Sequence, residues 1–447
     1  ETPFRERSKP DQLAFQISNS GTKRYENVPV KLNINKTERG LETIGVGPDS
    51  TINSNITYTL SGAGIQQGEL RFNDFPVTFD DAFYFSYSLP EKIKILVVNG
   101  DDPSPNLNQL YGSAPAFELK NIQANQIDYA QVPLQQFIVL NELNSFSSGM
   151  ILELVKFVKN GGSLGILPAL DSDLESYRAL NNALNTAEYG TWQQITQKGG
   201  SINLQHPIYD DVFEKKQENI DLPSVKKYLP FKVKGNAQED VIIKLQNGDL
   251  LLASYSVGKG KVYMSSVPLQ EESSNLARHA IFIPTFYKMA LYSESASKLY
   301  YTIGNEEPIE LKNTILSGDQ TLKIRSTNGP FEMIPEHRTV DGKTQVFVRN
   351  QITEAGNYLI QQGDSVLAAL SFNYNRKESL SSFYSEEEVL TSLEKAGWTT
   401  ARVLDGSLKE LKQEVAQLDE GKPLWKLFLL LALLFLAVEI ALIRLMK

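Results

Sequence analysis

The chain has 447 residues, of which 41% are hydrophobic and 22% charged, the composition of a globular protein with room for about three domains. Its 53 acidic and 44 basic side chains give a net charge of −9, and without a basic stripe we expect no nucleic-acid partner. The sequence contains no cysteine and three histidines. This excludes disulfides, thiolate metal ligands and a cysteine nucleophile, and we expect neither a metal nor a cofactor.

Residues 1–10 are polar and indicate a linker, and residues 11–90 have the pattern of an all-β domain. Apolar and polar residues alternate in 28–32 and 83–87, and turn residues separate about six short runs. This spacing predicts an immunoglobulin-like β-sandwich. We expect this domain to act as a spacer or as a protein-docking module.

The period changes at Glu91, and residues 91–298 predict an α/β domain with a parallel sheet, of the flavodoxin-like kind. Its central stretch has apolar runs at 137–140 and 164–167 that enclose a segment of helical period, with buried positions from Met150 to Val158. Ser147 or Ser148 can cap this helix, and Gly161-Gly162 ends it. A strand, a helix and a strand with short connections predict two parallel neighbouring strands.

The carboxyl ends of parallel strands are where such a sheet forms its ligand crevice. Candidate residues follow three strands there, namely Asp101, Asp102, Asn106, Asn141, Glu142 and Asp171. A hard cation needs about six oxygen ligands, and no fixed spacing completes such a set. An acidic loop that caps the next helix is the simpler interpretation of Asp101 and Asp102.

Further along, the pattern predicts helices over 173–184 and 275–292, with a β-turn at Gly258-Lys259-Gly260. That turn lacks the GxxxxGK[ST] spacing of a phosphate-binding loop. Residues 299–375 return to short runs punctuated by glycine and predict a second small β-sandwich. Residues 376–423 are charged and partly helical, typical of a stalk.

Residues 424–446 are apolar and long enough to form a transmembrane helix. Trp425 and Lys426 suit one membrane interface, and Arg444 and Lys447 suit the other. We expect an inner-membrane protein with most of its chain in the periplasm, an orientation that needs an export signal upstream of Glu1. Glu439 lies within the span, where a carboxylate costs on the order of 2–3 kcal/mol unless paired. It either reaches the interface or Arg444, or it pairs with a group on a partner's helix.

Three sequence segments resemble a known family. The first is residues 68–81 together with Phe83-Tyr84-Phe85, and the second is residues 93–99. The third is Leu140-Asn141-Glu142 together with residues 147–149 and 160–162. In these the chain resembles the Bacteroidetes BatA-domain (aerotolerance-regulator N-terminal) membrane proteins, from about residue 11 to the C-terminal span. The resemblance implies a CARDB-like immunoglobulin module and a class I glutamine-amidotransferase-like domain. It also implies association with MoxR-type AAA+ ATPase and von Willebrand A systems. No adhesion motif of the DxSxS kind is placed to act here.

Amidotransferase chemistry uses a cysteine on a tight strand-to-helix turn, and this chain has none. A serine hydrolase built from Ser172 with His206 or His279 is a remaining alternative, although 168–172 lacks the GxSxG elbow. We therefore predict a non-catalytic, membrane-anchored envelope scaffold that binds other membrane or envelope proteins. A small-ligand or carbohydrate binder that uses the crevice is the other alternative.

Overall fold

The computed structural model describes residues 10–59, 62–73, 78, 81–209, 212–213, 220–232, 239–293, 298–311, 321–340, 343–376, 384–398 and 424–446. The predicted linker, apart from Pro10, and residues 377–383 and 399–423 of the predicted stalk lie outside the described residues. The chain divides into two compact units, Glu1–Ser379 and Leu380–Lys447.

The first unit begins with a β module of two sheets. Side chains alternate between core and solvent along its strands, and Val30, Leu32 and Ile56 lie at the centre of its core. The two-stranded sheet consists of β1 (Pro10–Asn19) and β4 (Ser50–Thr59), and the four-stranded sheet has the order β3 (Thr37–Val46), β2 (Tyr25–Ile34), β5 (Gly64–Arg71), β6 (Ala82–Leu89). The predicted β-rich start is confirmed.

The middle of the unit is built on a nine-stranded mixed sheet. Five neighbouring strands are parallel, in the order β8 (Phe117–Gln123), β7 (Ile93–Asn99), β9 (Phe137–Leu143), β10 (Ser163–Pro168), β17 (Gly260–Ser265). The sheet continues antiparallel through β16 (Leu250–Val257), β15 (Glu239–Leu245), β12 (Gln197–Ile202) and β13 (Ser224–Val225). The prediction of a parallel sheet is therefore confirmed for the strands from β8 to β17 and is wrong for the strands from β16 to β13. The turn Gly258-Lys259 joins β16 directly to β17, and a connection this short allows only antiparallel neighbours.

The predicted strand–helix–strand unit is present, with β9 and β10 as parallel neighbours on either side of α2 (Ser148–Lys159). Ser147 caps α2, since its hydroxyl accepts a hydrogen bond from the backbone N–H of Met150 at 3.2 Å. Gly161 ends it at φ 110°. A Cβ on Gly162 would meet the ring of Phe157 at 2.2 Å, so this position requires glycine for packing.

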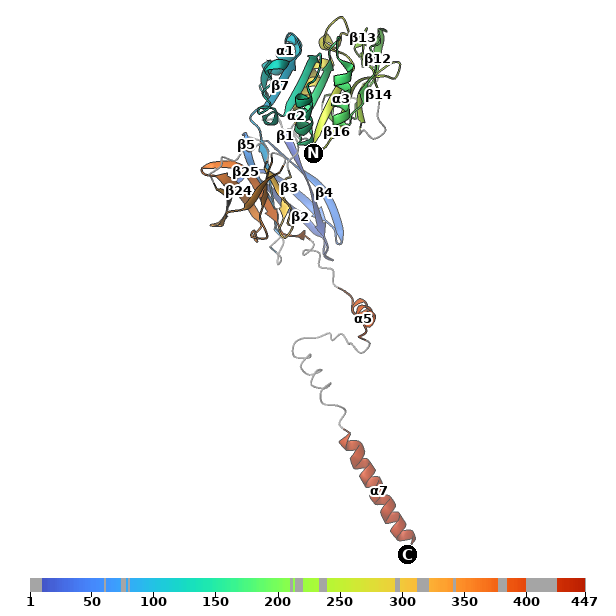
Figure 1. Cartoon of the computed structure of the whole chain (residues 1–447). Helices are drawn as coiled ribbons and strands as arrows, with labels where there is room; N and C mark the ends of the chain where they lie inside the picture. Colours follow the sequence, from blue (N-terminus) through green and yellow to red (C-terminus); the bar gives the residue numbers. More distant parts are fainter. Residues whose placement is uncertain are drawn as a thin grey trace. The chain divides into compact units, whose positions relative to one another are not determined.

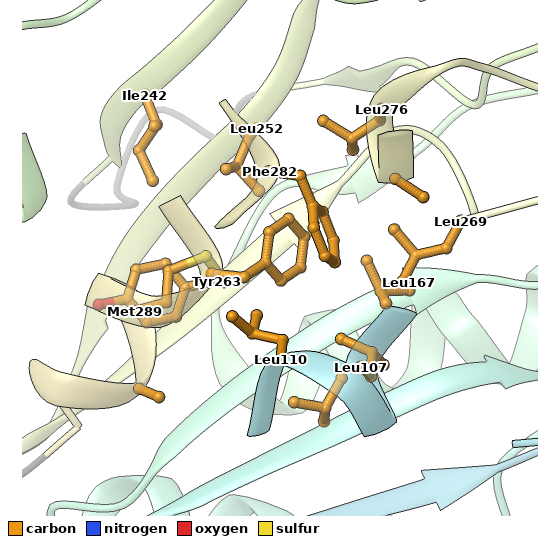
Figure 2. Packing of buried hydrophobic residues seen from close by; sticks show 14 of the residues in the cluster. Leu107, Leu110, Leu167, Ile242, Leu252, Tyr263, Leu269, Leu276, Phe282 and Met289 are labelled. Carbon is orange, nitrogen blue, oxygen red and sulfur yellow. The ribbon is translucent and has the colours of Figure 1, made fainter. Parts of the chain in front are cut away.

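Helices cover both faces of this sheet. On one face, α1 (Pro105–Ser113) and α4 (Phe282–Leu291) pack onto the sheet, and Figure 2 shows Leu107, Leu110 and Phe282 in one buried cluster with Leu167 and Leu252. On the other face lie α2 and α3 (Leu174–Leu184). Minor elements are η1 (Ala124–Gln126), η2 (Val132–Leu134), η3 (Pro207–Tyr209), β11 (Glu188–Tyr189) and β14 (Phe231–Lys232).

The helix predicted over 275–292 is interrupted. A 3-10 turn, η4 (Leu276–Arg278), comes first, and α4 starts only at Phe282. Between them His279 is extended at ψ 146°, and its Nδ1 accepts a hydrogen bond from the backbone N–H of Ile281 at 3.3 Å. This local bond competes with the backbone pattern of a helix and explains the break.

The first unit ends with a second β module that contacts the first. Its larger sheet has the order β18 (Tyr301–Thr302), β25 (Ser365–Asn373), β24 (Gly356–Gln362), β20 (Leu322–Ser326), β21 (Glu332–Met333), and its smaller sheet has the order β19 (Ile309–Leu311), β23 (Lys343–Phe347), β22 (Glu336–Val340). The Asn373 side chain accepts from the N–H of Tyr84 at 2.7 Å and donates to its carbonyl at 2.8 Å. Asn357 donates to the carbonyl of Gly68. In Figure 1, β24 and β25 accordingly lie against the strands of the first module.

The second unit contributes two described helices. Ser385 and Glu388 form a capping box at the start of α5 (Glu386–Lys395). The other, α7 (Trp425–Leu445), has 21 residues, a stretch of 18 of which has a mean hydropathy of 2.6, and it is drawn in red in Figure 1. By length and composition α7 is able to cross a membrane, as predicted.

Candidate functional site at the carboxyl edge of the central sheet

A chain of asparagine side chains lies at the carboxyl ends of three parallel strands. Asn141 at the end of β9 donates to Oδ1 of Asn99 in β7 at 2.9 Å, and Asn99 donates to Asn121 in β8 at 3.3 Å. Asn121 donates in turn to Asn108 on α1. Asn99 and Asn141 are buried, so these bonds replace the water that their amides lose. Oδ1 of Asn141 is buried without a hydrogen-bond partner among the described residues.

Glu142 holds an unusual backbone conformation beside this chain. Its φ is 57°, in the left-handed region that a residue with a side chain adopts at a cost, and the pairing of β9 with β10 is irregular at this point. The irregularity brings the carbonyl of Glu142 so close to Gly100 that a Cβ there would lie 2.0 Å from the oxygen. Gly100 also donates its N–H to the carbonyl of Asn141 at 3.0 Å. The turn after β7 and the end of β9 are thus packed backbone to backbone.

The carboxylate of Glu142 is half-buried and bonded to the loop after β17. It accepts hydrogen bonds from the backbone N–H of Leu269 at 2.9 Å and from the Gln270 side chain at 2.7 Å. Burial is the main reason that the pKa of Glu142 is raised; the two hydrogen bonds oppose the rise, and the charges of Asp101 and Glu272 add to it. Glu142 therefore ties together three segments of the sheet edge.

The turn after β10 is occupied by Tyr177, which sequence reasoning did not single out. Tyr177 extends from α3, is fully buried, and donates its hydroxyl to the carbonyl of Leu143 at 2.5 Å. The same hydroxyl accepts the N–H of Ala169 at 3.2 Å. Desolvation is the main reason that its pKa is raised far above the ordinary value. The only sequence signal was a tyrosine on the apolar face of a predicted helix.

The predicted crevice residues occupy three different settings. Asp101 and Asp102 are exposed, and the carbonyl of Asp101 accepts a hydrogen bond from Gln123 at 2.8 Å. Asn106 lies in the first turn of α1 and is half-buried. Asp171 is exposed and accepts a hydrogen bond from Asn144 at 3.0 Å. The structure thus brings Asn141, Glu142 and Asp101 together and holds Asp171 in the neighbouring loop. The loop after β7 caps α1 as predicted, but through Ser104 and not through Asp101 or Asp102.

The serine and histidines of the alternative hydrolase are not assembled. Oγ of Ser172 is buried and makes no hydrogen bond to any described residue. Nε2 of His279 lies 3.3 Å from Asp221, whose pKa is lowered mainly by its hydrogen bond with Lys198 and then by that with His279.

His206 lies beside Ser254 and Asp240, but the arrangement of these three side chains does not suit catalysis. Its Nε2 lies 3.1 Å from Oγ of Ser254 and 3.4 Å from Asp240, while its Nδ1 accepts the N–H of Ile208. Because Nδ1 is an acceptor, a neutral His206 carries its proton on Nε2. It then donates toward Ser254 and Asp240 and has no lone pair with which to activate the serine.

Two further features bear on ligands. A hollow around Gly165 lies between the sheet and α4, with Phe137, Tyr263, Phe286 and Met289 in its wall, and it has no space as large as a water molecule. Within the described ranges, no three His, Asp or Glu side chains are grouped as metal ligands.

Comparisons with known protein families and with curated proteins give no match. Solved structures with a similar arrangement include a GMP synthase component from Thermoplasma acidophilum, at 10% identity over 45% of this chain and 94% of that one, with a TM-score of 0.31. A ThuA-like protein from Bacteroides uniformis matches at 11% identity over 49% of this chain and 95% of its own, with a TM-score of 0.33. A cytoplasmic protein from Salmonella typhimurium matches at 12% identity over 45% and 98%, with a TM-score of 0.36. These likenesses concern fold alone.

Proposed function

We propose that this chain is a non-catalytic, membrane-anchored protein of the cell envelope that offers its β modules and α/β domain as surfaces for partner proteins. In this proposal the first β module is immunoglobulin-like. The central domain is an amidotransferase-like fold that serves as a rigid scaffold. The bulk of the chain lies on the periplasmic side of the inner membrane.

The observation that carries the proposal is the occupation of the central sheet edge by the protein's own side chains. Tyr177 joins the backbone ends of β9 and β10 through Leu143 and Ala169. Glu142 is bonded to Leu269 and Gln270. An active edge needs free backbone N–H groups and an exposed nucleophile at these positions. Side chains that bond to one another here favour a structural role.

The anchor in this proposal is α7, and its exposed apolar surface supports the assignment. The whole helix lies outside the protein cores, with large side chains such as Phe428 and Phe435 more than 60% exposed. A surface of this kind is stable when hydrocarbon covers it. The BatA resemblance predicts partners linked to MoxR-type ATPases.

Purification of the full chain from its native membranes in a mild detergent tests this function. We expect at least one other membrane or envelope protein at a fixed ratio in independent preparations, measured by quantitative mass spectrometry. A fluorophosphonate probe should not label Ser172. Hydrolase activity that Ser172→Ala removes would contradict the non-catalytic assignment.

A small-ligand or carbohydrate binder is the second candidate, favoured by the buried Oδ1 of Asn141 that has no partner within the described residues. A thermal-shift screen with a sugar panel tests it, with Asp101→Ala as the control variant. A shift that Asp101→Ala abolishes would support binding at this edge. The absence of any sugar-dependent shift would count against it.

A further inference from the structure

Glu439 is the acidic residue within α7, and its own helix offers it no partner. Positions three and four residues away share its face, and all four are apolar: Phe435, Leu436, Leu442 and Ile443. Arg444 is five residues away, about 140° around the helix, so it lies on a different face. Among the described residues, no ion pair joins Glu439 to Arg444, so the local pair considered from the sequence does not form.

The depth of Glu439 follows from the helix bounds. It lies 14 residues after Trp425 and 6 before Leu445, which at 1.5 Å per residue places it about 21 Å and about 9 Å from the two ends. A span of this length matches a hydrocarbon core of about 30 Å. Arg444, which suits the nearer interface, is five residues or about 7.5 Å further along the helix, and a glutamate side chain with two methylene groups is shorter than this distance.

We propose that Glu439 is an intramembrane docking point for a transmembrane helix of another protein that carries a lysine or arginine at the same depth. This inference rests on the membrane anchoring proposed above and names the partner's chemistry. A cationic side chain is the complement of a lone carboxylate in hydrocarbon, where water does not compete for either charge. A second copy of this chain would instead bring two carboxyl groups together, and at least one of them would have to take up a proton, whereas a lysine or arginine pairs with the carboxylate in its charged form.

A designed partner helix tests the pairing directly. The full chain is labelled at Met446→Cys, which gives a single site because the protein has no cysteine, and is reconstituted into phosphatidylcholine vesicles. The probe is a synthetic Leu/Ala transmembrane helix with one Lys about 9 Å from one end, the same depth as Glu439. Energy transfer between the labelled chain and a labelled probe measures their association. We expect about tenfold tighter association than with an all-Leu/Ala helix, equivalent to about 1.4 kcal/mol.

Variants at matched positions identify the contact. Glu439→Leu should remove the preference for the Lys probe, whereas Glu439→Gln should retain a weaker one through hydrogen bonding. The double variant Glu439→Leu, Leu436→Glu moves the carboxylate by three residues on the same face. It should shift the preference to a probe whose Lys is moved by the same depth.

Three results would overturn the inference. The first is equal association of the Lys and all-Leu/Ala probes, and the second is a Lys preference that persists in Glu439→Leu. The third is Glu439-dependent association between copies of the chain without any probe. Vesicle flotation separates these from a failure of the anchoring itself: a chain that does not float with the vesicles contradicts the proposed function instead.

Discussion

The hydroxyl of Tyr177 gives the sharpest test of the filled sheet edge, because Tyr177→Phe removes one oxygen and leaves the ring. The ring packs against Phe146 and Tyr189 at centroid distances of 4.6 and 5.7 Å, and these contacts remain in the variant. The change leaves the carbonyl of Leu143 and the N–H of Ala169 without their partner. Each unpaired buried group costs about 1–3 kcal/mol. We therefore expect a loss of about 2–4 kcal/mol in the free energy of unfolding.

Tyr263 provides a matched control for the same chemical change. It belongs to β17 of the same sheet and is equally buried, but its hydroxyl has no hydrogen-bond partner among the described residues. Tyr263→Phe removes a desolvated hydroxyl without breaking a bond, so we expect a change within about 0.5 kcal/mol or a gain in stability. The larger effect of Tyr177→Phe would then report its two hydrogen bonds.

Urea unfolding of the full chain in mild detergent, followed by tryptophan fluorescence, measures both variants. Equal losses for Tyr177→Phe and Tyr263→Phe would refute the reasoning, because the hydrogen bonds would then contribute nothing specific. A neutral Tyr177→Phe would likewise show that the hydroxyl does not hold the ends of β9 and β10 together.

Three further variants, one of them with a matched control, probe the same unit. Gly100→Ala should destabilise by about 2–4 kcal/mol in urea unfolding, because its Cβ would meet the backbone oxygen of Glu142 at 2.0 Å; Gly112→Ala, with 3.7 Å to its nearest atom, should be neutral or stabilising. The raised pKa of Glu142 means that the folded state holds this proton more tightly. Its contribution to stability is thus present below the unfolded pKa of about 4.3 and lost as pH rises through the folded pKa, and Glu142→Gln should remove that part of the pH dependence. Asn373→Ala, which removes both bonds to the backbone of Tyr84, should cost about 1–3 kcal/mol and expose the contact between the β modules to proteolysis.

Local signals predicted the central strand–helix–strand unit well. The helical period from Met150 to Val158, the Ser147 cap and the Gly161 stop are encoded within a few residues of one another, and each has its expected geometry. The apolar span at the C-terminal end is equally local. Such features depend on propensity and period, which a sequence displays directly.

The details of the site depend on contacts between distant segments and were not predictable in the same way. The φ of Glu142 reflects the approach of Gly100 and the bonds to Leu269 and Gln270, more than 120 residues later in the chain. The sequence placed Asn141 and Glu142 at the correct edge but gave no sign that Tyr177 would reach it. The break at His279 was missed because a side-chain bond to the backbone of Ile281 competes with the helix.

The native mass of the full chain, solubilised from its own membranes with mild detergent and measured by light scattering, tests the proposed scaffold role most directly. We predict a particle larger than the 50.0 kDa chain, with another protein in fixed ratio. Glu439→Leu should weaken the complex, so that a smaller share of the chain carries the partner, and should leave the unfolding of the chain in urea unchanged. A wild-type chain that is monomeric, with no protein in fixed ratio, would contradict the scaffold role.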